Sequence, residues 1–377
     1  MVFAIVFKNF THGFWLMEAK KTVGGSLATG GLARGCELCI TGHKLVLFVT
    51  GLCNQKCYYC TISEGRWQRD EIWANERRVG KPEDIVEEAR VCRSKGAGIT
   101  GGEPLMKIDR VVEYITLLKG EFGKGFHVHL YTNGTLANDE NLKKLHEAGL
   151  DELRIHMDRD AVKRALQYPR WRVGMEVPCI PGEEKELCEL VDYLESIGAH
   201  FLNLNELEFS ERNVLPMETL GMTQCTDSLT AVQGSRETAE KVLKHAEEKA
   251  VPVHFCTARL KLDYQLRNRL INRAKSIRRP FEKVTNNGFL RKGVVEGGTA
   301  VEMAEELKAL KVPEKTFCHN DRANRTEFSE EAARILAKKS KFMVSVVEEY
   351  PSAEPWDWEK TPLNGMAARK FATRQNG

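Results

Sequence analysis

The order of strand-like and helix-like segments constrains the fold of this 377-residue chain more than any other feature. Between residues 45 and 255, short apolar runs alternate with amphipathic stretches of helical spacing, as parallel βαβ units require. Six or seven such units predict an α/β protein with a partial or closed parallel barrel. The expected strands are 45–50, 97–100, 126–132, 153–157, 173–179, 201–207 and 251–255, and the expected helices are 82–94, 111–118, 137–148, 160–167, 183–197 and 238–249.

Three cysteines follow the first expected strand. Cys53, Cys57 and Cys60 have the spacing C-x3-C-x2-C. Thiolates are soft ligands that suit iron–sulfur clusters, and a short loop can wrap around one cluster at little cost in closure entropy. Three thiolates hold three corners of a four-iron cube and leave one iron open to a small molecule. The alternatives are structural zinc, which usually takes four ligands, and buried cysteines that only pack.

Two further motifs lie at the ends of the next two expected strands. They are Gly-Ala-Gly-Ile-Thr-Gly-Gly-Glu-Pro and Leu-Tyr-Thr-Asn-Gly, and Tyr59 is the aromatic residue before the last cysteine of the loop. Together, over residues 43–260, these motifs resemble the radical S-adenosylmethionine (SAM) superfamily. Within it the sequence is most similar to archaeal proteins described as related to pyruvate formate-lyase activating enzyme. The resemblance implies a partial (β/α)6 parallel barrel, a [4Fe–4S] cluster and SAM.

The resemblance also implies roles for particular residues. The three loop cysteines would hold the cluster, and the amine and carboxylate of SAM would chelate the open iron. Gly101, Gly102 and Glu103 would bind the amino group of SAM, Asn133 would touch the cofactor, and Tyr59 would lie against its adenine. The alternatives are a tight turn for the glycine pair and a core position for Tyr59.

Polar residues near the ends of later strands extend this candidate site. Arg154 and His156 share one face of the fourth expected strand, Glu176 lies in the fifth, and Asn203 and Asn205 lie in the sixth. Buried polar side chains need partners, so an apolar lumen would not hold them without a ligand. We therefore expect His156 to contact the cofactor or the substrate. The alternative is that these side chains face helices or solvent.

A second cysteine pair predicts another metal site. Cys36 and Cys39 form a C-x2-C pair before the first expected strand, which is half of a tetrahedral site. The complete site would be a second iron–sulfur cluster or a structural zinc. The residues available to complete it are Cys256 and Cys318, with His254 and His319 in reserve. The alternative is a pair of reduced thiols without a metal.

Charge is distributed unevenly along the chain. The net charge is +3, but the stretch from Arg259 to Lys292 holds eleven Lys or Arg and two acids, so it carries 11 − 2 = +9 and the remainder carries −6. This asymmetry favours a polyanionic partner such as RNA, and the alternative is a solvated face balanced by acidic neighbours. An amphipathic basic helix is predicted from the spacing of Leu262, Leu266, Leu270 and Ile277. Residues 293–339 are expected to be helical.

Three regions are expected. They are an N-terminal extension with the Cys36/Cys39 pair (1–42), the radical SAM partial barrel (43–258), and a basic helical segment with a C-terminal extension (259–377). Eleven cysteines together with a cluster motif predict a reducing, cytoplasmic environment. No apolar run approaches the ~20 residues of a membrane span, so no membrane is expected as a partner.

The expected activity is that of a radical SAM enzyme. Such an enzyme cleaves SAM reductively to a 5′-deoxyadenosyl radical, which takes a hydrogen atom from a substrate. RNA or protein is the favoured substrate class, and a ferredoxin or flavodoxin is the expected electron donor. A protein-activating or methyl-transferring radical SAM enzyme is the alternative. Outside this class, the alternative is a non-catalytic zinc or iron–sulfur protein.

Overall fold

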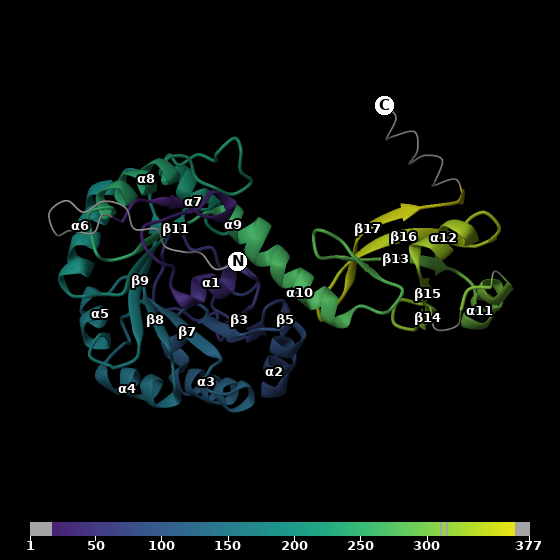
Figure 1. Ribbon diagram of the computed structural model, residues 1–377, viewed down its shortest axis with the longest axis horizontal. Helices are drawn as coiled ribbons and strands as arrows, with labels where there is room; N and C mark the ends of the chain where they lie inside the picture. The colour runs from purple at the N-terminus through teal and green to yellow at the C-terminus, as the bar shows by residue number, and fades with distance from the viewer. Residues whose placement is uncertain (1–16, 310, 314–315, 366–377) are drawn as a thin grey trace. The chain divides into compact units, whose positions relative to one another are not determined.

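The computed structural model describes residues 17–309, 311–313 and 316–365, which form two compact units (Figure 1). Unit 1 comprises the described residues up to 88 together with residues 94–266. Unit 2 comprises residues 89–93 and the described residues from 267 onward. Residues 1–16 of the expected N-terminal extension lie outside the described residues. Among the described residues, no helix is both long enough and apolar enough to cross a membrane.

Unit 1 is built on an eleven-stranded sheet with a parallel centre, which confirms the predicted α/β class. Short antiparallel strands flank the centre: β1 and β2 lie beyond β11, and β4 and β5 lie beyond β3. The strand order begins at β1 and ends at β5, so these strands form an open barrel. In order, the parallel strands are β3 (Lys44–Phe48), β6 (Gly96–Thr100), β7 (His127–Thr132), β8 (Glu152–Ile155), β9 (Arg172–Cys179), β10 (Phe201–Glu206) and β11 (Val253–Cys256). The flanking strands are β1 (Lys20–Lys21), β2 (Leu27–Ala28), β4 (Trp73–Ala74) and β5 (Arg77–Arg78).

Helices connect the parallel strands, and all of them except α7 (Val214–Thr219) overlap a predicted helix. Local sequence fixes their ends: Asn138 caps α4 by accepting from the Asn141 backbone N–H, and Gly149 ends it in the left-handed conformation with φ 95°. The connecting helices are α2 (Pro82–Val91), α3 (Ile108–Phe122), α4 (Asp139–Ala148), α5 (Arg159–Ala165), α6 (Glu184–Ser196), α7 (Val214–Thr219) and α8 (Ser235–Ala246). The remaining helical segments of unit 1 are η1 (Val23–Gly25), η2 (Pro104–Lys107), α9 (Ala258–Leu260) and the π-helical η3 (Lys261–Leu266).

One further helix, α1 (Arg34–Ile40), lies within the curve of the sheet (Figure 1). It contacts β3, β6 and β7, and most of its residues are buried. Gly35 permits this approach, because a Cβ there would lie 2.6 Å from the Arg154 guanidinium and 2.7 Å from the His129 ring. Helix α1 therefore fills part of the space that the strands enclose.

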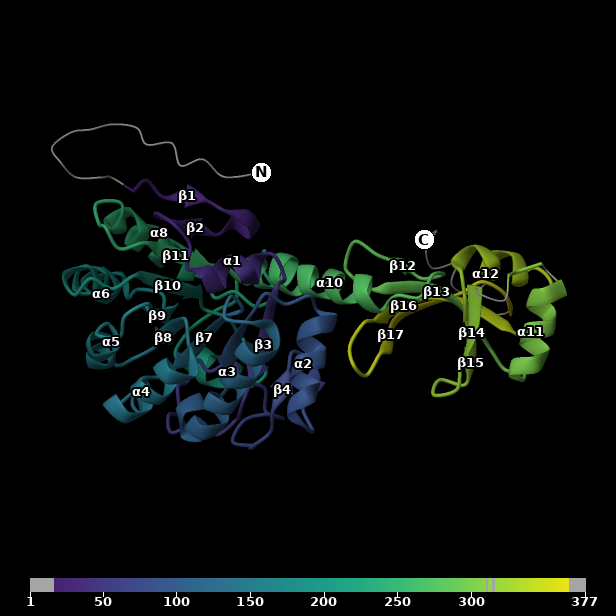
Figure 2. The ribbon, with the colours of Figure 1, turned by 60° about the horizontal axis from the view of Figure 1, so that its bottom comes forward.

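Unit 2 contains a six-stranded antiparallel sheet, so the expectation that residues 293–339 are helical holds only for α11 and α12 and is wrong for the strands between and before them. Helix α12 packs on β13 and β16, and α11 packs on β15 (Figure 2). Their apolar faces form a small core around Phe328 and Val344. Strands in this region are short, and a few apolar residues fit either period. The elements are β12 (Lys283–Val284), β13 (Leu290–Glu296), α11 (Ala300–Ala309), β14 (Phe317–Asn320), β15 (Arg325–Phe328), α12 (Glu330–Leu336), β16 (Met343–Tyr350) and β17 (Trp356–Pro362).

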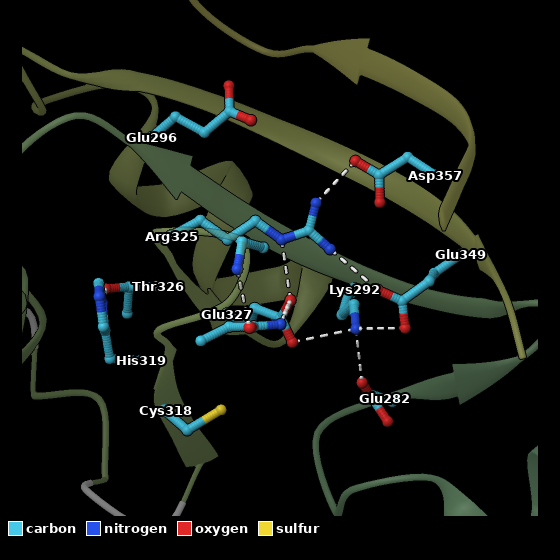
Figure 3. Close-up of polar contacts among 12 residues, drawn as sticks. Glu282, Lys292, Glu296, Cys318, His319, Arg325, Thr326, Glu327, Glu349 and Asp357 are labelled. Carbon is cyan, nitrogen blue, oxygen red and sulfur yellow. Dashed lines mark hydrogen bonds and ion pairs between the residues drawn. The ribbon is translucent and has the colours of Figure 1, made fainter. Parts of the chain in front are cut away.

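A buried ionic network lies on this sheet (Figure 3). The Lys292 ammonium, 2% exposed, lies 2.9 Å from the Glu282 carboxylate, 3.0 Å from that of Glu327 and 2.9 Å from that of Glu349. Arg325 pairs with Glu327, Glu349 and Asp357 at 2.8, 2.9 and 2.6 Å. Buried charges are tolerated when each has partners of opposite sign, and here both cations have three.

The predicted amphipathic basic helix is only partly present. The segment consists of the π-helical η3 followed by α10 (Arg267–Ile277). Of the apolar positions expected on one face, Leu270 is buried, whereas Leu262 is 53% exposed and Ile277 is 36% exposed. A π-helix has a wider turn than an α-helix, so Leu262 and Leu266, which lie within it, do not keep the α-helical spacing to Leu270.

Candidate functional site

The three predicted cluster cysteines lie in the loop that follows β3, at the carboxyl end of the parallel strands. Cys53, Cys57 and Cys60 are all half-buried, and all three line a cavity of about 340 Å³. The loop is braced from behind, because Gly51 exchanges backbone hydrogen bonds with Gln68 and Arg69. Three thiol sulfurs therefore border one cavity at the end of a barrel where parallel α/β folds place their chemistry.

The glycine pair after β6 fixes this loop to the sheet. The Gly102 N–H donates to the Thr50 carbonyl and the Glu103 N–H to the Leu52 carbonyl, both at 2.8 Å. A Cβ at Gly101 would lie 2.4 Å from the Thr50 oxygen, and one at Gly102 would lie 2.3 Å from the Leu52 oxygen. Both glycines line the cavity. Only glycine allows the two backbones to run this close, so the pair does more than form a turn.

Glu103 is fully buried and does not line the cavity. Its carboxylate accepts from the Leu105 N–H at 2.9 Å, the Thr132 hydroxyl at 2.7 Å and the Asn133 N–H at 2.7 Å. Burial raises its pKa, and these three hydrogen bonds oppose the rise. In this structure Glu103 therefore serves as an internal acceptor that positions the end of β7, a use that the motif alone does not reveal.

Asn133 is held at the cavity wall. Its side-chain amide donates to the Asn54 side-chain oxygen at 2.7 Å, and its own side-chain oxygen accepts from the Thr135 N–H and hydroxyl at 3.0 and 2.7 Å. Asn54 belongs to the cysteine loop and in turn donates to the Thr135 hydroxyl at 2.8 Å. Asn133 thus joins the end of β7 to the loop as well as lining the cavity.

Tyr59 and His156 lie together in the cavity wall. The Tyr59 hydroxyl is 2.8 Å from His156 Nε2, and His156 Nδ1 is 2.9 Å from the Glu176 backbone oxygen. A carbonyl beside Nδ1 requires a proton there, so in neutral His156 the Nε2 atom accepts and Tyr59 donates. Burial and the neighbouring Cys57 raise the Tyr59 pKa, which keeps this hydroxyl protonated at neutral pH.

The ion pair between Arg154 and Glu176 forms another part of the cavity wall. The Arg154 guanidinium lies 2.6 Å from the Glu176 carboxylate, which also accepts from the amides of Asn203 and Asn205 at 3.0 Å each. Burial opposes ionisation of Glu176, but Arg154 and the two amides more than offset it, so its pKa is lowered. The predicted lumen residues therefore come together, although most of their polar groups bond to one another.

Several lining residues were missed by the sequence reasoning. Tyr131 receives hydrogen bonds from Lys44 and Arg154, at 3.4 and 3.3 Å. Lys261 comes from η3, and its ammonium pairs with Glu208. The alternation of the third strand, which places Tyr131 on the face of His129, was a usable signal. The contribution of η3 had no such signal, since nothing in the sequence brings that segment to the cavity.

The four cysteines of the predicted second metal site are divided between the units. Cys36 and Cys39 lie in α1 and Cys256 ends β11, whereas Cys318 lies in unit 2 beside Arg279. Cys36 accepts from Arg154 at 3.4 Å, and burial raises its pKa to about 11. No group of three or more His, Cys, Asp or Glu in the described residues, the loop cysteines included, is arranged around a single metal ion. The second site stays a prediction.

The residues around the cavity fit an iron–sulfur cluster and its ligand. Three cysteines line the cavity, and their soft sulfur donors are the set that a [4Fe–4S] cluster with one open iron requires. Beside them the glycine pair lines the cavity and lets the cysteine loop lie directly against the end of β6. Asn133 and His156 add polar groups to the same wall.

Comparisons with known proteins agree with this geometry. The family model of the radical SAM superfamily matches residues 47–166. A Methanocaldococcus jannaschii protein named "Putative glycyl-radical enzyme activating enzyme" is 40% identical over 357 residues, which cover 88% of this chain and 93% of that protein. A GTP 3′,8-cyclase of Corynebacterium glutamicum is 25% identical over 281 residues, or 62% of this chain and 74% of that protein.

Among solved structures, SuiB of Streptococcus suis bound to SAM matches with a TM-score of 0.41 and 14% identity. The match covers 57% of this chain and 50% of that chain. From the family model and the relative that is similar over nearly its whole length, the chain belongs to the radical SAM superfamily, whose enzymes use a [4Fe–4S] cluster and SAM.

Proposed function

We propose that Cys53, Cys57 and Cys60 hold the cluster and that SAM occupies the adjoining cavity of unit 1. When bound, the reduced cluster supplies the electron that cleaves SAM to methionine and a 5′-deoxyadenosyl radical, which takes a hydrogen atom from the substrate. The observation that carries this proposal is that one cavity of about 340 Å³ joins all three loop thiols to the glycine pair and to the polar lumen.

The chain's own residues would bind and orient SAM. Gly101 and Gly102 hold the cysteine loop against the end of β6, and Asn133 offers a side chain already aligned by Asn54. Glu103 holds Asn133 from behind rather than reaching the cavity. Tyr59, fixed by its hydrogen bond to His156, gives the cysteine loop a second anchor on the opposite side.

The part of the wall formed by Arg154 and Glu176 would face the substrate. Arg154 and Glu176 are fixed by their mutual ion pair and by two amides, so their positions do not depend on the substrate. Lys261 and Arg212 also line the cavity, and Arg212 stacks over the Trp67 ring at 3.4 Å. Such fixed groups orient a substrate at low entropic cost. Helix α1 fills the space behind them, which limits the access of water from that side.

A protein substrate is supported by the name of the M. jannaschii relative, an activating enzyme for a glycyl-radical enzyme. We propose the same substrate class here, with a low-potential ferredoxin or flavodoxin as electron donor. Methyl transfer is the alternative outcome of the same SAM site.

An RNA partner held by the whole stretch between Arg259 and Lys292 has less support. At least six of its eleven cations are paired with carboxylates: Arg259, Lys261, Arg279, Lys283, Arg291 and Lys292. Paired cations attract phosphate weakly, because their field is already cancelled. The exposed Lys275 and Arg278 have no carboxylate partner among the described residues.

The test is anaerobic reconstitution followed by product analysis. With dithionite and SAM, the wild-type protein should form 5′-deoxyadenosine, and the Cys57→Ala variant should not. The half-buried Cys225 lies outside the cysteine loop, so Cys225→Ala is the matched control and should keep full activity. Equal product from the Cys57→Ala variant contradicts the proposed cluster site. S-adenosylhomocysteine in place of 5′-deoxyadenosine indicates methyl transfer, and a colourless zinc protein contradicts the cluster itself.

A further inference from the structure

Unit 2 carries a continuous group of four aromatic side chains that the SAM chemistry does not use. Phe289 lies 5.4 Å from Trp358 and 5.8 Å from Tyr350, Tyr350 lies 5.5 Å from Trp356, and the two tryptophans are 5.4 Å apart, all between ring centroids. Phe289 is buried, whereas Trp356 is 49% and Trp358 57% exposed. These four residues are called the aromatic platform below.

Two tryptophans half in solvent are costly unless something covers them. Large exposed aromatic side chains are uncommon on surfaces that have no partner, and they mark binding sites. The platform is rigid, because antiparallel pairing aligns Tyr350 of β16 with Trp356 of β17 and their rings stack at an interplanar angle of 14°. A preordered pair of flat rings is suited to stacking against another flat ring.

Basic side chains lie along the neighbouring helix. The turn between β12 and β13 packs on α10, since a Cβ at Gly288 would lie 2.7 Å from the Ile271 backbone nitrogen. Ile271, Lys275 and Arg278 are spaced i, i+4 and i+7, so they share one stripe, with the cations about 6 and 10 Å along the axis from Ile271. Phe289, the first member of the platform, directly follows Gly288.

The charge around these groups is positive. Residues 267–279 contain six Arg or Lys and no Asp or Glu. Lys275 and Arg278 are exposed. Several carboxylates of unit 2 form ion pairs with Lys292 and Arg325 inside the unit. Glu359, next to Trp358 in β17, and Glu354, in the turn before β17, are exposed carboxylates that would oppose an anion.

We propose that the aromatic platform and the Lys275–Arg278 stripe together bind single-stranded RNA. Exposed aromatic rings beside a basic track are how proteins hold single strands: bases stack on the rings and phosphates follow the cations. RNA loops and ends offer unstacked bases to such rings, whereas a duplex keeps its bases stacked inside. This binding is independent of the cluster chemistry proposed for unit 1.

The proposal predicts two separable effects on binding. A base stacked on an aromatic ring loses its contact when that ring is removed, so Trp356→Ala and Trp358→Ala should each weaken binding by about tenfold. A cation that contacts a phosphate releases a counterion from the nucleic acid. On a single strand, each such contact contributes about 0.7 to the slope of log K against log salt. Replacing both Lys275 and Arg278 by Ala should therefore reduce the slope of log K against log salt by about 1.4.

The experiment is fluorescence anisotropy of a labelled oligouridine of about 12 nucleotides, within the usual single-strand site size, with the full chain over a range of salt. The matched controls are Leu229→Ala for an exposed apolar residue and Lys20→Ala with Lys21→Ala for exposed lysines of unit 1 that, like Lys275 and Arg278, have no carboxylate partner among the described residues. Trp358→Tyr, which keeps a ring, should bind nearly as wild type. Thermal unfolding of each variant shows whether it is folded.

Wild-type binding that the tryptophan and cation variants weaken as described, and that the controls leave unchanged, supports the proposal. Absence of binding at low salt contradicts it. If neither tryptophan variant weakens binding, or if a duplex of the same length binds with equal affinity, the attraction is due to charge alone. Either result also contradicts the proposal. In those cases the platform belongs to another class of partner, such as a protein.

Discussion

Glu103→Gln tests the structural role of the buried glutamate most sharply. The native carboxylate accepts three hydrogen bonds, two at one oxygen and one, from the Asn133 N–H at 2.7 Å, at the other. Glutamine has one oxygen and one NH2 group. If the oxygen keeps the bonds from Leu105 and Thr132, the NH2 group faces the Asn133 N–H, and two donors oppose each other in a buried site.

The expected cost follows from these contacts. A hydrogen bond to a charged group contributes about 1.5–3 kcal/mol, and a buried donor left without an acceptor costs about 1–3 kcal/mol. Part of this is offset, because burial raises the Glu103 pKa and the neutral amide avoids the desolvation of a charge. We therefore expect the free energy of unfolding to fall by about 2 kcal/mol.

Two measurements check this expectation. Urea denaturation gives the change in the free energy of unfolding, and hydrogen exchange of the peptide around Asn133 should speed up because its N–H loses its acceptor. Glu113→Gln, at an exposed position of α3, is the control and should change neither. A Glu103→Gln protein as stable as the wild type, with unchanged exchange but no SAM binding, would refute this reasoning and place the carboxylate on SAM itself.

Three further predictions concern packing, buried charge and pH. Gly102→Ala should displace the cysteine loop and lower the amount of iron bound on reconstitution. Gly65→Ala is the control and should bind iron normally, because a Cβ at Gly65 meets nothing within 4 Å. Equal amounts of iron in the two variants contradict the packing argument. Lys292→Met leaves buried carboxylates unpaired, so it should lower the free energy of unfolding, measured by urea denaturation, by about 3–5 kcal/mol. The exposed Lys283→Met is the control and should lower it by about 0–1 kcal/mol. A Lys292→Met protein as stable as the wild type would show that the network is not stabilising. Because the Glu176 pKa is lowered in the folded protein, ionised Glu176 stabilises the fold above pH 4.5, the ordinary pKa of a glutamate, and this stabilisation is lost as the pH falls further. Glu176→Gln should therefore make the free energy of unfolding depend less on pH in the acid range. An unchanged pH dependence contradicts the lowered pKa.

The parallel sheet of unit 1 was predictable because its signals are local and repeated. Each parallel strand, β3 and β6 to β11, contains a short run rich in apolar residues, and the helices between them end at residues such as Gly149 that fix the end locally. Unit 2 was not predictable in the same way. The pairing of β13 with β15 and β16 joins residues far apart in the chain, which no single window of sequence contains.

The candidate site likewise contains some residues that the sequence predicts and others that it does not. The three cysteines, Gly101 and Gly102 could be found from spacing, because a loop ligand set and a glycine pair each leave a pattern in the sequence. The internal role of Glu103 depends on a backbone N–H thirty residues away, and the approach of Lys261 depends on the path of η3. Contacts of this kind follow from the fold rather than from any motif.

The central claim is that the loop after β3 holds the cluster that cleaves SAM. It is tested most directly by the electron paramagnetic resonance spectrum of the dithionite-reduced, reconstituted protein, recorded with and without SAM. If one iron of the cluster is open to SAM, adding SAM should change the spectrum, and Cys57→Ala should abolish the signal while Cys225→Ala retains it. A reduced cluster whose spectrum is the same with SAM, in protein shown to bind SAM, would contradict the account.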